Sequence, residues 1–384
     1  MYFSRRFAIW PTLPLNVYFR KVSQWLPYPL NDEGCRVFSK ARHAIYNACR
    51  TLGLGKNDVM LVPAFHHGSE IEALLQAGVQ IRYYELTEML EPDPVSLQSL
   101  LTPGIRALYL IHYLGFPQDS LYWRQWCDER GLLLFEDAAQ SFLAEINKRP
   151  VGSFGHAAVF CLYKTYGIPD GGAVISIAPV APPASEIQPG RWRVFKRHVN
   201  WVAQHWAVLG SFLLFIKPMM KLLKKKNHNP HKEFEMGDPS SPPSAMTMRL
   251  FSRLVNKTTA EQRRENYKFL LNQFRHLVPH AFSSLPEGAC PFCFPIEVNN
   301  PQEVIKKLRR YGVAGLLFWR NPHPSLPVKD FPLSMAFRER VIGIPVHQEL
   351  TQSALQQIAK ALLKSTIQPV EVNPILKTNK SLSH

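Results

Sequence analysis

The residues best suited to chemistry lie between Phe135 and Ser176, where an acid, an amide and a lysine follow one another. Asp137 and Gln140 come after one apolar run, and Lys164 follows a second. A lysine amine can form a Schiff base with an aldehyde, while a carboxylate can keep a ring nitrogen protonated. This combination is the one that pyridoxal 5'-phosphate (PLP) chemistry requires, because the protonated ring acts as an electron sink. The sequence therefore predicts a PLP site built on Lys164 and Asp137.

The apolar runs before these residues have the length and composition of buried strands. They span Leu132–Phe135 and Ala157–Leu162, and Gly171-Gly172 opens a further strand-like run, Ala173–Ile177. Ligands of open α/β sheets bind at the carboxyl ends of the strands. We therefore expect Asp137 at such an end, and Lys164 on a tight, glycine-flanked loop between two strands.

The rest of the chain alternates helix-like and strand-like segments. Before Asp137, helices are expected at Ala41–Leu52, Glu70–Ala77, Pro94–Leu101 and Leu121–Arg130, and strands at Asp58–Val62, Gln80–Glu85 and Ala107–His112. This alternation predicts an α/β fold with a mainly parallel sheet between helices. Later helices at Thr258–Leu277, Pro301–Tyr311 and Ser353–Leu363, with a strand at Phe292–Val298, suit a smaller C-terminal α+β domain.

Several linked motifs resemble the DegT/DnrJ/StrS-type family of PLP-dependent sugar aminotransferases. The motifs are E-D-A-A-Q at Glu136–Gln140, V-G-S-x-G at Val151–Gly155, Lys164, G-G at Gly171-Gly172, the turn Val62–His67, the strand end Ile111–Gly115 and the closing strand Gly343–His347. The resemblance implies PLP fold type I, with a large domain containing a mainly parallel sheet and a smaller C-terminal α+β domain.

The resemblance also implies catalytic roles for three residues. Lys164 would hold the cofactor and Asp137 would pair with its ring nitrogen. His67 stands where the family stacks Phe or Trp over the ring, and an imidazole can stack there and also hydrogen-bond. Gln140 would reach the phenolic oxygen of the cofactor.

The phosphate of the cofactor is expected at the start of the first helix, because free N–H groups and the helix dipole favour an anion there. Ser39, Lys40 and Ala41 replace the family's G-T-x-A, so Lys40 adds a charge. Cys161 stands three residues before the lysine, where the family has a phosphate-binding serine, which puts that contact in doubt. The family's N-x-R loop is missing from the middle of the chain.

These features predict a homodimeric PLP-dependent aminotransferase (a transaminase). It would take an amino group from a donor such as glutamate and transfer it to a keto-sugar, nucleotide-linked, in polysaccharide or glycolipid biosynthesis for the cell surface. One alternative is a PLP-dependent lyase or dehydratase on the same fold; some of these replace the lysine with histidine, whereas Lys164 is present. Another is a non-catalytic relative that binds a membrane or an acidic partner.

The middle of the chain is strongly basic. Residues 191–232 contain ten Lys or Arg and no acid, against a net charge of +16 for the whole chain. The apolar run Ala207–Ile216 is shorter than the ~20 residues that cross a bilayer. We expect residues 201–226 to contact an anionic membrane peripherally, with a helical pair packed on a partner subunit as the alternative. No nucleic-acid motif accompanies the charge.

The sequence suggests four parts and a cellular location. The parts are an N-terminal arm (1–30), a PLP-binding large domain (31–190), a basic and apolar insertion (191–240) and a C-terminal small domain with a polar tail (241–384). Six scattered cysteines and the absence of a signal-like start favour the cytoplasm, with peripheral contact on the inner face of the membrane. Cys290 and Cys293 form a lone C-x-x-C, which favours structural cysteines and no metal site.

Overall fold

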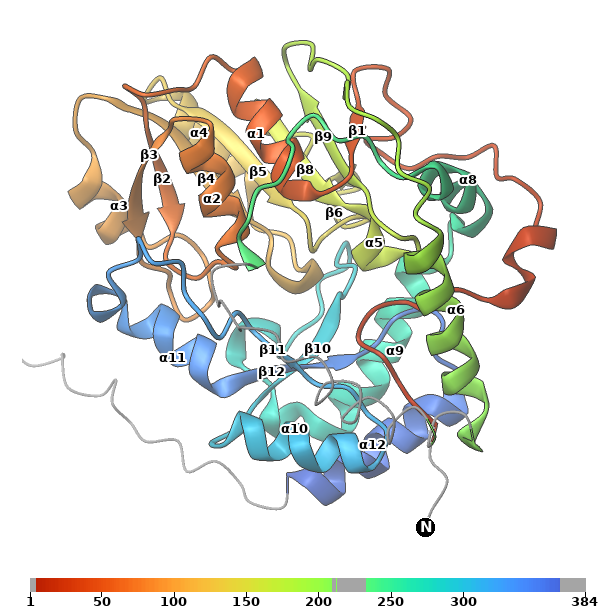
Figure 1. The fold of residues 1–384 in the computed structure, drawn as a ribbon. Helices are drawn as coiled ribbons and strands as arrows, with labels where there is room; N and C mark the ends of the chain where they lie inside the picture. Colours follow the sequence, from red (N-terminus) through yellow and green to blue (C-terminus); the bar gives the residue numbers. More distant parts are fainter. Residues whose placement is uncertain (1–4, 209–211, 213–232, 367–384) are drawn as a thin grey trace, which may run out of the picture.

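The computed structural model describes residues 5–208, 212 and 233–366 (Figure 1). Its main sheet has seven strands in the order β1-β9-β8-β5-β4-β2-β3. Strands β2, β3, β4, β5 and β8 are parallel to one another. Strand β9 is antiparallel to β8, and the edge strand β1 is antiparallel to β9. The strands are β1 Arg36–Phe38, β2 Val59–Pro63, β3 Gln80–Tyr84, β4 Ile105–Ile111, β5 Leu133–Ala138, β8 Ala157–Cys161 and β9 Gly172–Ser176.

Helices pack against this sheet, and every residue of β8 is buried, as expected for a strand covered on both faces. The helices are α1 Ala41–Thr51, α2 Ser69–Gln76, α3 Pro94–Leu100 and α4 Ser120–Asp128. Each expected strand and helix of this region is present, with ends that differ by a few residues at most. The predicted α/β class with a mainly parallel sheet is confirmed.

The C-terminal part lies below the main sheet in Figure 1. Its antiparallel sheet has the order β10-β12-β11, with β10 Cys293–Glu297, β11 Leu316–Leu317 and β12 Val341–Pro345. The helices are α8 Ala245–Leu254, α9 Thr259–Phe274, α10 Pro301–Arg310, α11 Pro332–Arg340 and α12 Gln352–Ser365. The sequence did not predict α8, α11 or β11. Other elements are the long helix α6 Arg191–His205 and the short elements η1 Leu15–Phe19, β6 Glu145–Ile146, β7 Arg149–Pro150 and α5 Leu162–Thr165.

Close backbone contacts join the two parts of the molecule. At the end of β4, Gly115 (φ +90°) lies so near Cys290 that a Cβ on the glycine would be 1.9 Å from the carbonyl oxygen of Cys290. The N–H of Cys290 donates to the Gly115 carbonyl at 2.9 Å. The last glycine of the Ile111–Gly115 motif is therefore required by packing against the C-terminal part.

The N-terminal arm is held by both parts. Its Phe7 exchanges backbone hydrogen bonds with Gly312 and Ala314 of the C-terminal part, each 2.9 Å. On the other side, a Cβ on Gly167 would lie 2.4 Å from the Thr12 carbonyl oxygen. The arm therefore has a fixed course next to the loop that follows Lys164.

Within the described residues, each helix is too short or too polar to span a lipid bilayer.

Candidate active site

A pocket of about 430 Å³ opens at the carboxyl ends of β4, β5 and β8, between the main sheet and the C-terminal part. Parallel sheets place their ligands at this edge. The pocket contains most of the predicted site residues. Its lining includes Trp10, Lys40, Ala41, Arg42, His67, Glu70, Asp137, Gln140, Cys161, Tyr163, Lys164, Glu233, Phe292, Trp319 and Arg320.

Asp137 is the buried acid of this pocket. Its Oδ2 accepts a hydrogen bond from the Tyr109 hydroxyl at 2.7 Å, and its Oδ1 accepts from the Ala139 N–H at 2.8 Å. Burial raises the pKa of Asp137, and the charge of Glu70 acts in the same direction. A carboxyl group with these properties is held rigidly and can share a proton with a basic nitrogen in the pocket.

Its neighbour Glu136 lies on the opposite face of β5, because successive side chains of a strand alternate. Its carboxylate accepts hydrogen bonds from His112 (3.1 Å), Ser120 (2.6 Å) and three backbone N–H groups of the V-G-S-x-G loop, those of Gly152, Phe154 and Gly155. Burial opposes ionisation, but these donors hold the pKa of Glu136 below its usual value. Glu136 therefore fixes the loop and has no place in the pocket.

Lys164 lines the pocket, and its Nζ lies 6.0 Å from the ring centroid of Phe292. The predicted tight loop is wrong in one respect, because Lys164 lies in the short helix α5, which begins directly after β8. The helical turn redirects the chain at the strand's carboxyl end. It therefore places the lysine at the same edge of the sheet as Asp137.

Gln140 is anchored through one end of its amide. Its Oε1 accepts a hydrogen bond from the Leu114 N–H at 3.0 Å, and its Nε2 has no partner among the residues that the structure describes. The side chain lines the pocket. Gln140 can therefore present an amide donor to an oxygen there.

His67 also lines the pocket, between the rings of Phe234 and Trp319, which it meets edge to face at 6.2 and 6.3 Å. Its backbone N–H donates to Glu70 at 2.7 Å. Burial lowers the pKa of His67, so its ring is neutral near pH 7. A neutral imidazole exposed to the pocket is compatible with the expected ring-stacking role.

The start of α1 forms the proposed phosphate cradle. Lys40 and Ala41 line the pocket, as does Arg42, and the N–H groups of Ala41 and Arg42 have no hydrogen-bond partner in the described part of the chain. A Cβ on Gly172 would lie 2.2 Å from the carbonyl carbon of Lys40. The glycine pair after the lysine is therefore needed to bring β9 against this helix start.

Two residues that were considered for binding the cofactor phosphate, Ser39 and Cys161, do not offer a free hydroxyl to the pocket. Ser39 is not part of the pocket lining; its Oγ lies 3.1 Å from His43 Nδ1, and its N–H donates to the Ser241 carbonyl at 2.9 Å. Cys161 does line the pocket but is fully buried, and burial raises the pKa of its thiol. Ser39 is a packing residue in this structure, and Cys161 presents a thiol where the family presents a hydroxyl.

Sequence reasoning missed the aromatic wall beside the lysine. Trp10 comes from the N-terminal arm, and its ring lies 5.3 Å from Phe292 and 6.3 Å from Tyr163, centroid to centroid. Glu70, which also lines the pocket, was likewise not assigned to the site by residue pattern. One aromatic residue in an arm that contains several others carries no local signal for a pocket whose Asp137 and Lys164 lie about 130 to 150 residues further along the chain.

The pocket fits PLP on the evidence of its own residues. It combines a buried carboxylate of raised pKa, a lysine at the same edge of the sheet, an amide donor and a helix start with free N–H groups beside two cations. By chemistry, Asp137 would suit the ring nitrogen of the cofactor, Lys164 its aldehyde and the start of α1 its phosphate.

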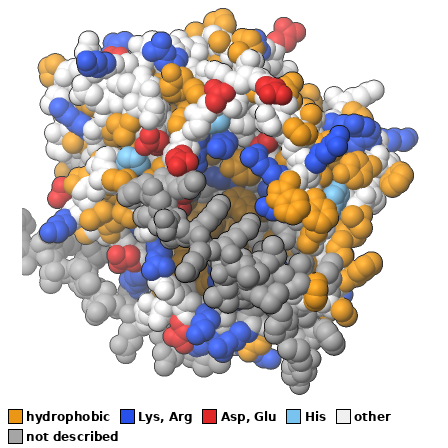
Figure 2. All heavy atoms as spheres, in the orientation of Figure 1, with side chains coloured by type: hydrophobic (Ala, Val, Ile, Leu, Met, Phe, Trp, Pro, Cys, Tyr) orange, Lys and Arg blue, Asp and Glu red, His pale blue; other side chains and the backbone are white. Residues whose placement is uncertain are grey.

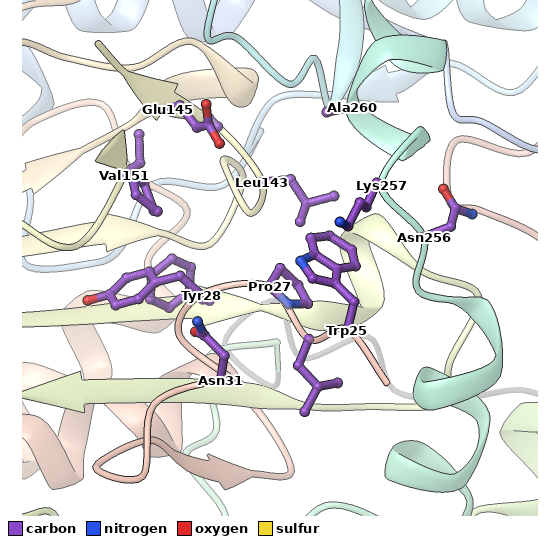
Figure 3. Close-up of a pocket in the computed structure, with 14 residues that line it drawn as sticks. Trp25, Pro27, Tyr28, Asn31, Leu143, Glu145, Val151, Asn256, Lys257 and Ala260 are labelled. Atoms are coloured by element: carbon purple, nitrogen blue, oxygen red, sulfur yellow. The ribbon is translucent and has the colours of Figure 1, made fainter. Parts of the chain in front are cut away.

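A second pocket, of about 260 Å³, lies between Trp25, Tyr28, Leu143 and the start of α9 (Figure 3). Its polar side chains are Asn31, Glu145, Asn256 and Lys257. None of the predicted catalytic residues lines it. Chemistry is therefore assigned to the larger pocket.

Cys290 and Cys293 are free and buried, and burial raises the pKa of both thiols. Cys293 lies in β10 and packs beneath Gly343, where a Cβ would be 2.9 Å from its Sγ. These contacts are those of packing residues.

The expected membrane segment 201–226 lies mostly outside the described residues, which cover 201–208 and 212 of it.

Residues 30–180 match the DegT/DnrJ/EryC1/StrS aminotransferase family. A UDP-N-acetyl-3-dehydro-alpha-D-glucosamine 3-aminotransferase of Acidithiobacillus ferrooxidans is 24% identical over 345 residues, covering 84% of this chain and 81% of that protein. A dTDP-3-amino-3,4,6-trideoxy-alpha-D-glucose transaminase of Streptomyces venezuelae is 34% identical over 142 residues, covering 35% of this chain and 37% of that one.

Solved structures share the fold. The putative sugar aminotransferase Spr1654 of Streptococcus pneumoniae matches with a TM-score of 0.64 at 14% identity, covering 95% of this chain and 97% of that one. DesV of S. venezuelae matches with a TM-score of 0.62 at 19% identity, covering 87% and 85%. The matched segment holds Asp137, Gln140 and Lys164 together with the glycines that position them, so the similarity to the DegT/DnrJ/EryC1/StrS aminotransferase family covers the part of the chain that builds the pocket.

Proposed function

We propose that this protein is a PLP-dependent aminotransferase that transfers an amino group to a nucleotide-linked keto-sugar. The observation that carries the proposal is the convergence of Asp137, Lys164 and the start of α1 on one pocket. The named relatives support the substrate class, because they act on UDP- and dTDP-linked sugars. When bound, PLP supplies an aldehyde for amines and a ring that withdraws electrons from the substrate carbon.

Each residue of the pocket then has a defined task. Asp137 keeps the ring nitrogen protonated, since its position is fixed by Tyr109 and Ala139. Lys164 would hold the cofactor and, once freed, would take a proton from the substrate carbon and return it. His67 would stack on the cofactor ring, and Gln140 would donate to the phenolic oxygen. Lys40 and the N–H groups of α1 hold the phosphate.

We further propose the partners of this reaction. The amino donor is a simple amino acid such as glutamate, and the product serves polysaccharide or glycolipid biosynthesis. The relative SpsC of Bacillus subtilis, 26% identical over 129 residues, is a spore coat polysaccharide biosynthesis protein. We propose a homodimer, cytoplasmic and in peripheral contact with an anionic membrane through residues 201–226.

An amino-transfer assay tests the proposed function. The purified protein is incubated with PLP, glutamate and a panel of nucleotide-linked keto-sugars, and the amino-sugar product is identified by mass spectrometry. We expect an amino sugar in at least one reaction, and none when the Lys164→Ala variant is used. If glutamate and other amino acids leave the PLP absorbance spectrum of the wild-type protein unchanged, the chain is no aminotransferase.

A further inference from the structure

One flank of the molecule exposes large aromatic side chains from two segments that are far apart in the sequence. Phe19, at the end of η1, is 90% exposed, and Trp192 and Phe195 on α6 are 65% and 55% exposed. Tyr18, Leu15 and Val22 are also exposed. Single exposed apolar residues are ordinary, whereas a continuous group of them marks a binding surface.

The two segments form one surface. The Tyr18 hydroxyl lies 3.0 Å from His198 Nε2, and the rings of the two residues are 5.6 Å apart. Deeper in the molecule, Arg197 donates to the Pro11 carbonyl at 2.9 Å. We call this surface the η1–α6 face; it comprises Leu15, Tyr18, Phe19, Lys21, Val22, Arg191, Trp192, Phe195 and Lys196. Figure 1 shows η1 beside α6, and Figure 2 shows hydrophobic and basic side chains together on that flank.

The charge of the face has one sign. Residues 1–31 and helix α6 contain no Asp or Glu, whereas Lys21, Arg191 and Lys196 are exposed on the face. The Nζ of Lys196 lies 5.1 Å from the ring centroid of Trp192, which in turn stacks on Phe195 at 5.4 Å. Cations and aromatic rings therefore alternate across a short distance.

This chemistry decides between the possible occupants. A second copy packed by two-fold symmetry would place two positively charged patches in one interface, which is unfavourable. A nucleic acid would use the charges and the rings, but the exposed aliphatic side chains of Leu15 and Val22 would gain nothing from stacked bases. At a lipid surface, aliphatic and aromatic side chains enter the acyl boundary while cations meet anionic headgroups.

We propose that the η1–α6 face docks on an anionic phospholipid membrane. The proposal extends the membrane contact suggested for residues 201–226 to a surface within the described residues. The face shares no residue with the pocket, so membrane binding and the proposed catalysis can be tested separately.

Vesicle co-sedimentation tests the proposal with the full-length protein. One variant replaces Phe19, Trp192 and Phe195 with Ser, and a second replaces Lys21, Arg191 and Lys196 with Gln. We expect the wild type to bind phosphatidylserine-containing vesicles and to ignore pure phosphatidylcholine. The aromatic variant should bind about tenfold more weakly at any salt concentration. The charge variant should lose about fivefold for each cation at low salt and little at high salt, because ions screen exposed charges beyond about 8 Å at physiological ionic strength.

The matched control replaces Leu121 and Tyr122 of α4 with Ser, because these residues are 59% and 51% exposed on another part of the molecule. It should bind vesicles like the wild type. PLP uptake by every variant shows that the pocket is folded. The proposal is overturned if the wild type ignores anionic vesicles or if both face variants bind normally. It is also overturned if only neutralising Lys221, Lys224, Lys225 and Lys226 abolishes binding, or if the face variants instead lose dimerisation or RNA binding.

Discussion

Glu136 and Asp137 are adjacent in β5, yet their carboxylates lie on opposite faces of the sheet and differ in how many hydrogen-bond donors surround them. The Glu136 side is saturated, with five hydrogen-bond donors converging on one buried carboxylate. The Asp137 side is held by two donors and opens into a pocket where the Gln140 Nε2 and the N–H groups at the start of α1 have no partner among the described residues. A saturated acid stabilises a fold, whereas an acid that still has bonding capacity can act on a ligand.

The largest expected effect is a loss of activity without a loss of stability when Asp137 is replaced. Asp137→Asn keeps the shape of the side chain and can still accept from the Ala139 N–H, while its amide nitrogen donates to the Tyr109 oxygen in place of accepting from it. The variant can no longer hold a charged ring nitrogen. We expect amino transfer to fall by roughly three orders of magnitude, as for other preorganised charges, with little change in thermal unfolding. Steady-state kinetics measures this, with Asp128→Asn on the surface of α4 as the control. Near-normal turnover in Asp137→Asn would show that another acid serves the ring.

The reverse pattern is expected at Glu136. Glu136→Gln leaves buried donors facing an amide nitrogen, which costs about 3 kcal/mol or more of unfolding free energy. Protein that does fold should retain much of its activity, since Glu136 lies outside the pocket. Denaturant unfolding measures the loss, against the exposed Glu129→Gln. A stable but inactive Glu136→Gln protein would contradict the division between the two sides of the sheet.

The pH dependence of stability probes two buried histidines, His66 and His347, each of which makes one hydrogen bond to a backbone carbonyl. Burial lowers the pKa of His66 to about 4 and that of His347, which contacts the Ala8 carbonyl of the arm, to about 3. Below pH ~6.5 the unfolded chain binds protons that the folded chain excludes, so stability should fall as the pH drops from about 6.5 towards 4. The loss is about 2 kcal/mol per histidine between pH 7 and pH 5. In His347→Gln the slope of unfolding free energy against pH should be clearly smaller; an unchanged slope would assign it to other groups.

A smaller effect is expected for the aromatic wall of the pocket. Trp10→Ala removes the ring that packs on Phe292 and Tyr163 beside Lys164. We expect kcat/KM for the sugar to fall about tenfold, since an aromatic contact contributes on the order of 1 kcal/mol beyond its area. PLP absorbance should stay close to that of the wild type. Trp206→Ala, at an exposed position, is the control, and equal kinetics in the two variants would remove Trp10 from the site.

The sequence predicted the Asp137 side of the sheet because its signals are local. An apolar run followed by an acid predicts a strand end, and parallel strands end at one edge of the sheet. The start of α1 was predicted because free helix N–H groups and the helix dipole favour an anion. Gly171 and Gly172 were recognised as a motif, but the reasons for them, a φ of +126° at Gly171 and the contact of Gly172 with the Lys40 peptide, needed the structure.

What the sequence did not predict depends on contacts between distant segments. Trp10 and Phe292 are 282 positions apart in the printed sequence and meet only because the arm is bound by both parts of the molecule. The role of Glu136 was also hidden, since an E-D pair does not tell which acid faces the loop. The η1–α6 face also depends on a contact between distant segments. Both η1 and α6 lie in basic, aromatic stretches of the sequence, but their contact through Tyr18 and His198 is a property of the fold.

The central claim is that Lys164 is the amine that holds the cofactor, and borohydride reduction followed by peptide mapping tests it most directly. Lys40 lies in the same pocket and is the natural competitor, so Lys164→Ala and Lys40→Gln are compared with the wild type. We predict a pyridoxyl group on Lys164 in the wild type and in Lys40→Gln, and none in Lys164→Ala. A label on Lys40 or any other lysine of the wild-type protein, or no label after reconstitution with PLP, would contradict the assignment of this pocket.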